Sequence, residues 1–289
     1  MTQKSSFLSV HIDKRMAALG FAALIAAGLW VDPNFKRDVN IRGWKLAFCA
    51  QNVTCVGLKG PYRPTRDKRV LRESLKPLMA SPLFRNLIDA AERDNAALCR
   101  SDDPQIAFID AYYESAHKVI SLPNKPLTPK MQATLLHELA HAAQFARLGH
   151  SIGDYDPISR VILNRFAEAG ADADATLMAW QIFKETGDRT WLDARQKLAP
   201  DITAAFLVTA RVDPAAVEDG RAWLAAFRQW FLYKPRTTFY DMMELSEMAS
   251  IVDDLGDDLP ESFGRTRVKF DILFNFAVPP SLRAHLNVR

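Results

Sequence analysis

From residue 128 onward the chain is divided into helices by proline. Three short polar residues stand directly before a proline: Thr128 before Pro129, Asp156 before Pro157, and Asp213 before Pro214. Such a side chain accepts a hydrogen bond from a free backbone N–H of the first turn, and proline fits the first helical position. The spacing predicts helices over 128–149, 156–187, 190–198, 201–211, 214–232 and 240–254, the first two ending at glycine.

The part of the chain before residue 128 has shorter and more mixed patterns. Residues 32–70 combine basic residues with glycine and proline, which predicts short strands and loops. Helical spacing follows in "DKRVLRESLKPLMASPLFRNLIDAAERDNAALC", interrupted by Pro77 and Pro82. The stretches "QIAFIDAYYE" and "AHKVISLP" are rich in β-branched and aromatic residues and predict a β-hairpin. We therefore expect an α+β fold, with a small N-terminal β region before a mostly helical C-terminal half.

Residues 1–31 form a segment of different character. Basic residues precede an uninterrupted apolar run, "MAALGFAALIAAGLWV", Met16 to Val31. As a helix this run would rise about 24 Å, slightly less than the roughly 30 Å core of a bilayer. The pattern predicts a signal peptide or a single-span membrane anchor, and so a location in the cell envelope, periplasmic or extracellular. A buried N-terminal helix of a cytoplasmic protein is the alternative.

The three cysteines bear on the compartment. Cys49 and Cys55 flank "AQNVT" and could close a hairpin loop with a disulfide, which would leave Cys99 unpaired and support an oxidising compartment. Two buried thiols are an equally good interpretation. Because no C-x-x-C pair occurs, the cysteines do not indicate a metal cluster.

Composition excludes one class of function. The 289 residues are 48% hydrophobic and 25% charged, as in an ordinary globular protein, and the formal net charge is only +3. Lysine and arginine are spread along the chain without a cluster interleaved with aromatic residues. Nucleic acid is therefore not an expected partner.

The first long predicted helix carries "TLLHELAHAAQ", which contains the pattern H-E-x-x-H. Residues four apart lie on one helical face, so His137 and His141 can direct their imidazoles at one metal ion, and zinc accepts neutral imidazole. Glu138 lies about 100° around the helix and can reach an open position of that ion, where it would accept a proton from water. The apolar neighbours predict a buried helix, in which these three polar side chains need partners.

A third metal ligand is expected from the next long helix. The sequence "FAEAGADADAT" places Glu168 and Asp172 on one face, and its alanines and glycine allow close packing against the first helix. Glu168 is predicted to bind the ion, and Asp172 to accept the second N–H of a ligating histidine. His150 is an alternative third ligand, and a solvated acidic stripe that includes Asp174 is the alternative interpretation of the carboxylates.

The two motifs together resemble those of a known family. "HELAH", followed 27 residues later by "EAGAD", is similar to the gluzincin pattern H-E-x-x-H then E-x-x-x-D of thermolysin-like zinc metallopeptidases, with a longer spacing than in thermolysin. The stretch from Ala111 to Asp241 also resembles bacterial proteins regarded as metallopeptidases that share a HELAHA motif. The resemblance implies a zincin-like fold in one domain over residues 32–289, whose C-terminal part is helical from about residue 190.

The resemblance also implies an activity and a set of site residues. One Zn²⁺ ion would bind His137, His141 and Glu168; Glu138 would be the general base, and Asp172 would support a ligating histidine. The implied reaction is hydrolysis of peptide bonds in a peptide or protein substrate by a metal-activated water.

Two further elements are expected to serve such a reaction. In zincins a strand ahead of the motif helix pairs with extended substrate, and "KVISLP", Lys118 to Pro123, occupies that place. A donor to the oxyanion is expected from the later helical part. The candidates are His150, Tyr155, Arg236 and Tyr240, of which Tyr240 in "TTFYD" is preferred.

Two other functions stay open from the sequence. One is a non-catalytic envelope protein whose zinc only braces two helices. The other is an intracellular regulatory metalloprotease whose N-terminal apolar run belongs to the core.

Overall fold

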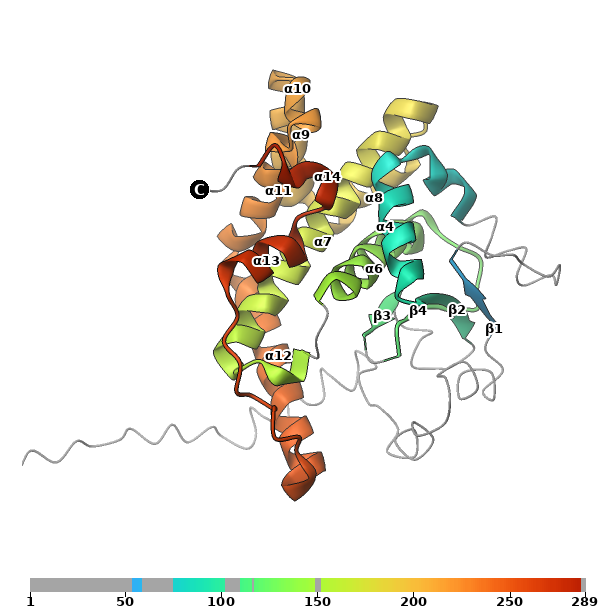
Figure 1. Ribbon diagram of the computed structural model, residues 1–289. Helices are drawn as coiled ribbons and strands as arrows, with labels where there is room; N and C mark the ends of the chain where they lie inside the picture. Colours follow the sequence, from blue (N-terminus) through green and yellow to red (C-terminus); the bar gives the residue numbers. More distant parts are fainter. Residues whose placement is uncertain (1–53, 59–74, 102–109, 116, 149–151, 287–289) are drawn as a thin grey trace, which may run out of the picture.

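The computed structural model (Figure 1) describes residues 54–58, 75–101, 110–115, 117–148 and 152–286. The strands are β1 (Thr54–Gly57), β2 (Ala97–Ser101), β3 (Tyr112–Glu114) and β4 (Val119–Pro123). The α-helices are α4 (Pro82–Arg93), α6 (Pro129–Leu148), α7 (Pro157–Thr186), α8 (Thr190–Leu198), α9 (Pro200–Val212), α10 (Ala215–Glu218), α11 (Arg221–Leu232), α12 (Lys234–Leu255), α13 (Phe270–Ala277) and α14 (Pro280–Arg283). Three short 3₁₀ helices are η2 (Lys76–Ala80), η3 (Ile152–Asp154) and η4 (Gly256–Asp258). The fold is α+β, as predicted.

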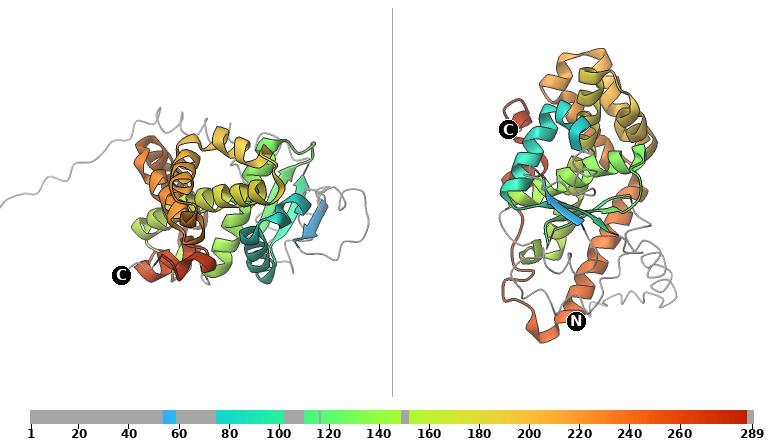
Figure 2. Two further views of the ribbon diagram at one scale, coloured as in Figure 1. Left: turned by 90° about the horizontal axis from the view of Figure 1, so that it is seen from above. Right: turned by 90° about the vertical axis from the view of Figure 1, so that its right-hand side faces the viewer.

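The sheet has four strands in the order β1-β2-β4-β3 and packs against α6 (Figures 1 and 2). β2 and β4 are parallel, while β1 and β3 pair antiparallel with their neighbours. The antiparallel β3–β4 pair confirms the predicted hairpin for the part of it that is described, since residues 102–109 lie outside the described ranges.

Two predictions about this sheet were wrong. The helical pattern that runs through "DNAALC" ends at Arg93, and Ala97–Ser101 instead forms β2. Asn95 has a left-handed φ of 61°, a conformation that does not continue an α-helix. "KVISLP" is not a free edge, because β4 is paired on both sides and all five of its residues are buried. In the described part of the sheet, the edge strand beside α6 is β3.

The predicted starts of α6 and α7 and the predicted end of α7 are confirmed, whereas the start predicted at Asp213 is not, since Asp213 ends α9 and α10 begins at Ala215. The Thr128 hydroxyl accepts a hydrogen bond from the Met131 N–H at 3.2 Å, and the Asp156 carboxylate accepts one from Ser159 N–H at 2.9 Å. Gly187 ends α7 with a φ of 76°.

The later helices follow the prediction less closely. The single helix predicted over 214–232 is divided into α10 and α11, because Gly220 has a φ of 82°. The prediction for 240–254 is extended at its start, since α12 begins at Lys234. α13 and α14 were not predicted.

α7 is the central element of the helical part. It contacts α6, α8, α9, α11, α12 and α13 (Figures 1 and 2). Small residues make this possible: a Cβ at Gly170 would lie 2.7 Å from Gln144 Nε2 and 2.9 Å from the Ala277 carbonyl oxygen. α6, α7 and α13 therefore approach one another at a point where only glycine fits.

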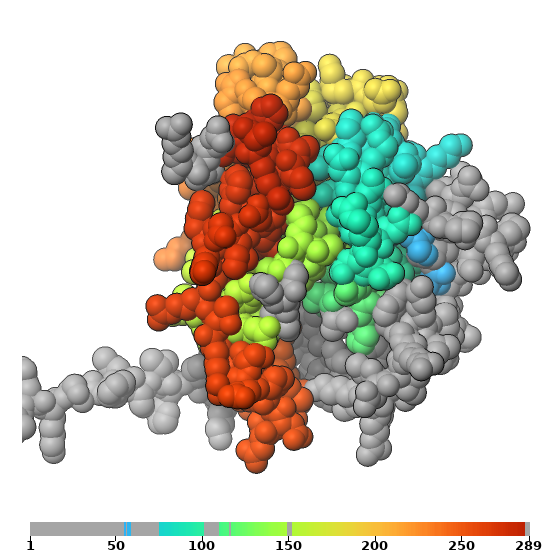
Figure 3. All heavy atoms as spheres, viewed as in Figure 1, coloured from blue at the N-terminus to red at the C-terminus, as the bar shows by residue number. Residues whose placement is uncertain are grey.

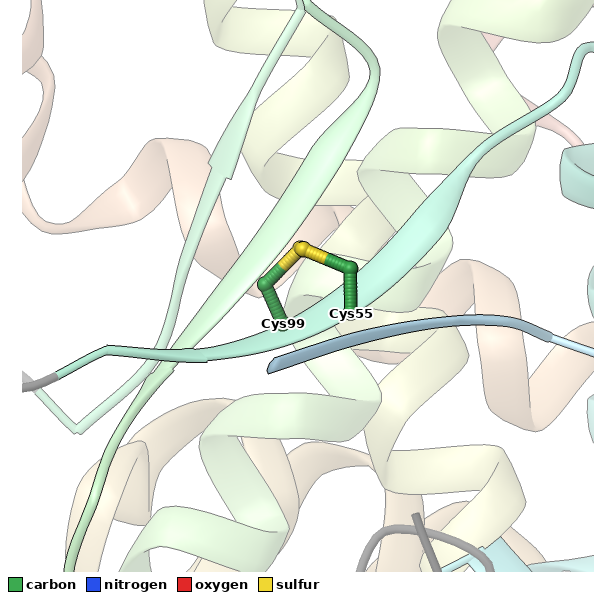
Figure 4. Close-up of a disulfide and its surroundings, with 2 residues drawn as sticks. All are labelled: Cys55 and Cys99. Carbon is green, nitrogen blue, oxygen red and sulfur yellow. A yellow bond between two sulfur atoms is a disulfide. The ribbon is translucent and has the colours of Figure 1, made fainter. Parts of the chain in front are cut away.

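A disulfide joins Cys55 to Cys99 (Figure 4) and corrects the predicted pairing. The two residues are direct partners across β1 and β2, with 4.1 Å between their Cα atoms. Cysteines that face each other across antiparallel strands are close enough to bond, whereas two cysteines at the ends of a loop are not held together in this way. The sequence alone does not show which strands pair. Cys99 is thus not the unpaired cysteine, and Cys49 lies outside the described residues.

The predicted N-terminal signal or anchor, residues 1–31, also lies outside the described residues. Among the helices that are described, none combines the length and the apolar character needed to cross a bilayer.

We predict that peptide mapping without reduction recovers Cys55 linked to Cys99. Replacing both cysteines with serine should lower the free energy of unfolding by about 2–4 kcal/mol, because the bridge closes a long loop of the unfolded chain. Denaturant titration of the full chain measures this difference. Recovery of a Cys49–Cys55 peptide in its place would contradict the strand pairing.

Candidate metal centre

α6 and α7 bring three metal-binding side chains to one point. His137 and His141 lie one turn apart on α6, and Glu168 faces them from α7. The Nε2 atoms of the two histidines are 3.0 Å apart, and each is 3.3 Å from a Glu168 carboxylate oxygen. The three residues that the sequence suggested as ligands are therefore gathered around one position.

The outer nitrogen of His137 faces a carboxylate. Its Nδ1 lies 3.1 Å from Asp172 Oδ1, one turn after Glu168 on α7. Asp172 is in turn fixed by Arg195 of α8, whose guanidinium donates a hydrogen bond of 2.6 Å to the same oxygen. Because Asp172 can only accept, His137 carries its proton on Nδ1 and presents the Nε2 lone pair to the centre.

The outer nitrogen of His141 faces an amide instead. Its Nδ1 lies 3.0 Å from Gln144 Oε1, on the same helix, and Gln144 Nε2 donates to the Ala167 carbonyl at 3.0 Å. That carbonyl accepts only, so it fixes which end of the fully buried Gln144 amide points at His141. His141 is therefore also protonated on Nδ1, with its Nε2 lone pair directed inward.

This hydrogen bonding can be tested for its fit to a metal ion. Two imidazole lone pairs and a carboxylate converge within 4.8 Å, and none of these atoms is a donor to the others when both Nδ1 atoms hold the protons. Glu168 Oε2 is buried without a hydrogen-bond partner among the described residues. Facing acceptors repel unless a cation lies between them, and two imidazoles with one carboxylate are a ligand set that suits zinc. The residues fit a bound Zn²⁺.

The charges of the site lead to the same conclusion. Burial opposes a charge on His137, but Asp172 and Glu168 outweigh it and raise the pKa of His137 well above its ordinary value. Burial would raise the pKa of Glu168, yet His141 and His137 lower it to about 2. The carboxylate stays ionised at neutral pH and favours a positive charge at the centre, for which protons and a metal compete.

Glu138 lies beside the three candidate ligands and not among them. Its Oε2 accepts a hydrogen bond of 2.8 Å from the Tyr113 N–H of strand β3. Burial raises the pKa of Glu138, and the neighbouring His137 and His141 offset part of that rise. A buried carboxylate with a raised pKa and one oriented oxygen is suited to take up and release a proton.

Of the four predicted oxyanion donors, the described structure brings one to the centre. Tyr240 of α12 lies near Glu168, and the charge of Glu168 together with burial raises the pKa of Tyr240 well above its ordinary value, so the hydroxyl keeps its proton. Tyr155 packs in a separate apolar cluster, and Arg236 is bound to Asp201 at 2.7 Å. His150 lies outside the described residues.

Asp174 is not part of a solvated acidic stripe, which corrects that alternative. Its side chain is fully buried and accepts a hydrogen bond of 2.6 Å from the Trp223 indole N–H. Burial raises the pKa of Asp174 to about 7, although Arg147 and the bond to Trp223 act in the opposite direction. Asp174 therefore ties α7 to α11 behind the metal centre.

Two residues of the site were missed by sequence reasoning. Gln144 lies three residues after His141, so its position on the same helical side was a usable signal. Arg195 comes from a different helix, and the sequence contains no local signal for its bond to Asp172.

Comparison with known proteins adds one match. A family model described as "Putative metallopeptidase family (DUF6782)" matches residues 49–257, well over half of the chain. This range includes both helices of the metal centre and α12. No curated protein and no solved structure matches the chain.

We predict that Gln144→Met weakens zinc binding about 10- to 100-fold while the fold is kept. Methionine fills a similar volume but cannot accept from His141 Nδ1, so the imidazole loses its fixed tautomer. Competition with a chromophoric chelator measures the affinity, and nitrogen NMR of the histidines reports the tautomer. Gln132→Met, on the same helix outside the centre, is the matched control. Equal affinity in the two variants would show that Gln144 only fills space.

Proposed function

The chain belongs to this metallopeptidase family, and on that premise we propose that it is a zinc-dependent peptidase of the gluzincin type. The observation that carries the proposal is the convergence of two imidazole lone pairs and the buried Glu168 carboxylate, with Glu138 beside them. The same proposal includes a zincin-like fold, in which a sheet lies beside the helix that carries the motif. This is supported by the edge strand β3, which lies along α6 and contacts Glu138.

The roles of the residues follow from their positions. His137, His141 and Glu168 would hold Zn²⁺, which when bound polarises a water molecule and lowers its pKa. Glu138 accepts a proton at the oxygen that Tyr113 leaves free and later delivers it to the leaving amide nitrogen. Asp172 and Gln144 keep both imidazoles in the tautomer that binds metal.

The substrate is proposed to bind as an additional strand along β3. β3 is the edge strand in the described sheet, and its Tyr113 N–H lies at the general base. Extended peptide recognises such an edge through backbone hydrogen bonds, largely independent of sequence. This replaces the strand that the sequence suggested, since β4 is paired on both sides.

Tyr240 is proposed to stabilise the oxyanion that forms when water attacks the peptide carbonyl. Its hydroxyl reaches Glu168 and stays protonated, so it can donate to a developing negative charge next to the metal ligands.

We also propose that the protein acts outside the cytoplasm, in the cell envelope. The apolar run after Lys14 and Arg15 supports export or anchoring, and the Cys55–Cys99 disulfide supports an oxidising compartment.

Glu138→Gln is expected to keep zinc affinity within a few fold and to lower peptide hydrolysis by a factor on the order of 10²–10⁴, because glutamine is close in shape but cannot accept the proton. A proteome-derived peptide mixture, with cleavages read by mass spectrometry, measures hydrolysis by the zinc-loaded full chain. The exposed Glu185→Gln is the matched control. A wild-type protein that binds zinc and cleaves nothing would contradict the proposal and favour the zinc-braced alternative.

Tyr240→Phe should reduce kcat about 10²- to 10³-fold, because the oxyanion donor is removed, and should keep zinc affinity within a few fold, because all three candidate ligands are retained. Steady-state kinetics on a peptide cleaved by the wild type separates kcat from KM. Tyr233→Phe, on the exposed side of the same helix start, is expected to have no effect. If kcat is unchanged in Tyr240→Phe, the residue is a packing aromatic.

A further inference from the structure

α12 exposes an apolar stripe to solvent. Its largest members are Met242, Leu245 and Val252, whose side chains are 63%, 50% and 42% exposed. Ala249 is exposed between Leu245 and Val252, and Thr238 is exposed one turn before Met242, so the stripe repeats at alternating steps of three and four residues. This is the spacing of the a and d positions of a coiled coil, a pattern that predicts packing against another helix.

The stripe is not the face by which α12 packs on its own protein. That face carries Tyr240 near the metal centre and Met248, which is buried. It also carries Glu244, which accepts a hydrogen bond of 2.6 Å from Arg160 of α7. The end of α12 extends beyond the other helices (Figures 1 and 3). At about 100° per residue, the stripe positions fall on a different side of the helix from Tyr240, Glu244 and Met248.

The charges of α12 are placed against its own dipole. The first turn carries Lys234 and Arg236 and no acidic residue, although Arg236 is already bound to Asp201 of α9. The last turn carries Asp253 and Asp254 and no basic residue. A helix is stabilised by the opposite arrangement, with acids at its N-terminus and bases at its C-terminus. Asp257 and Asp258 continue the acidic end.

One partner would account for both the exposed apolar stripe and the unfavourable charges at the ends of α12. We propose that α12 is a homodimerisation helix, on which the stripe of a second copy packs in antiparallel orientation. An antiparallel copy covers the apolar stripe and places each acidic helix end beside the basic end of the other helix. A membrane surface fits less well, because the acidic end of α12 would be repelled by anionic lipids.

The proposal fixes a register. With the two-fold axis at Leu245, that residue faces its own copy, and Thr238 faces the partner's Val252. Lys234 then lies at the level of the partner's acidic helix end. α12 has 22 residues and is about 33 Å long, and its stripe has fewer residues than the roughly 20–30 that each partner contributes to a standard interface. The dimer is therefore expected to be weak and concentration-dependent.

Cysteine cross-linking of the full chain tests the proposal independently of zinc and activity. Under mild oxidation, Leu245→Cys should give about tenfold more disulfide-linked dimer than Val208→Cys, an exposed valine on α9, because the two-fold axis raises the effective thiol concentration. Wild-type protein gives the background from Cys49. Thr238→Cys and Val252→Cys should not cross-link alone but should do so when mixed.

Each other result would overturn the proposal. Leu245→Cys at the level of Val208→Cys would show that the stripe does not meet its own copy. Self-linking of Thr238→Cys would show a parallel pair. Flotation with phosphatidylglycerol vesicles that is lost in Met242→Glu, without cross-linking, would identify a membrane as the occupant. Because the cross-link is expected in Glu138→Gln as well, a failure here is distinguishable from a failure of the proposed peptidase activity.

Discussion

The close contact between α6 and α7 is the interaction on which the rest of this structure depends. Neither helix holds a metal site alone: α6 supplies two imidazoles and α7 a carboxylate. They can approach this closely because residue 170 is a glycine. A Cβ at that position would lie within 3 Å of Gln144 and of the Ala277 carbonyl oxygen. A shift of one helical turn, about 5.4 Å, would remove Glu168 from the histidines and Asp172 from His137. The position of α7 along α6 therefore determines whether the candidate metal ligands come together.

The polar groups around the centre are arranged so that few buried charges lack a partner. His137 is supported by the ionised pair of Asp172 and Arg195, whereas His141 is supported by the neutral amide of Gln144. One ligand therefore has a charged partner and the other a neutral one. A divalent ion would complete the balance, because the Glu168 carboxylate would offset part of its charge and the neutral imidazoles would not.

Sequence reasoning succeeded where the determining contacts are local. Helix caps depend on residues within one turn, so the roles of Thr128, Asp156 and Gly187 could be predicted. The two motifs of candidate ligands could also be predicted, because each lies on one helical face. It failed where the partner is distant in the chain. The central place of β4, the bond between Cys55 and Cys99 and the bond from Arg195 to Asp172 all depend on which elements pack together. A single sequence shows no local signal of that.

The rotation of α12 about its axis is the last determinant of the site. Arg160 is only 1% exposed and is paired with Glu244, and Arg165 is paired with Asp241 one turn earlier. A buried ion pair adds little net stability, because desolvation offsets its attraction, but it tolerates few geometries. The buried Arg160–Glu244 pair therefore holds one rotation of α12, and the partly exposed Arg165–Asp241 pair agrees with that rotation. In that rotation Tyr240 is directed at Glu168 while Met242 and Leu245 face solvent. The same pairs that place the Tyr240 side chain beside the candidate metal ligands thus expose the apolar stripe.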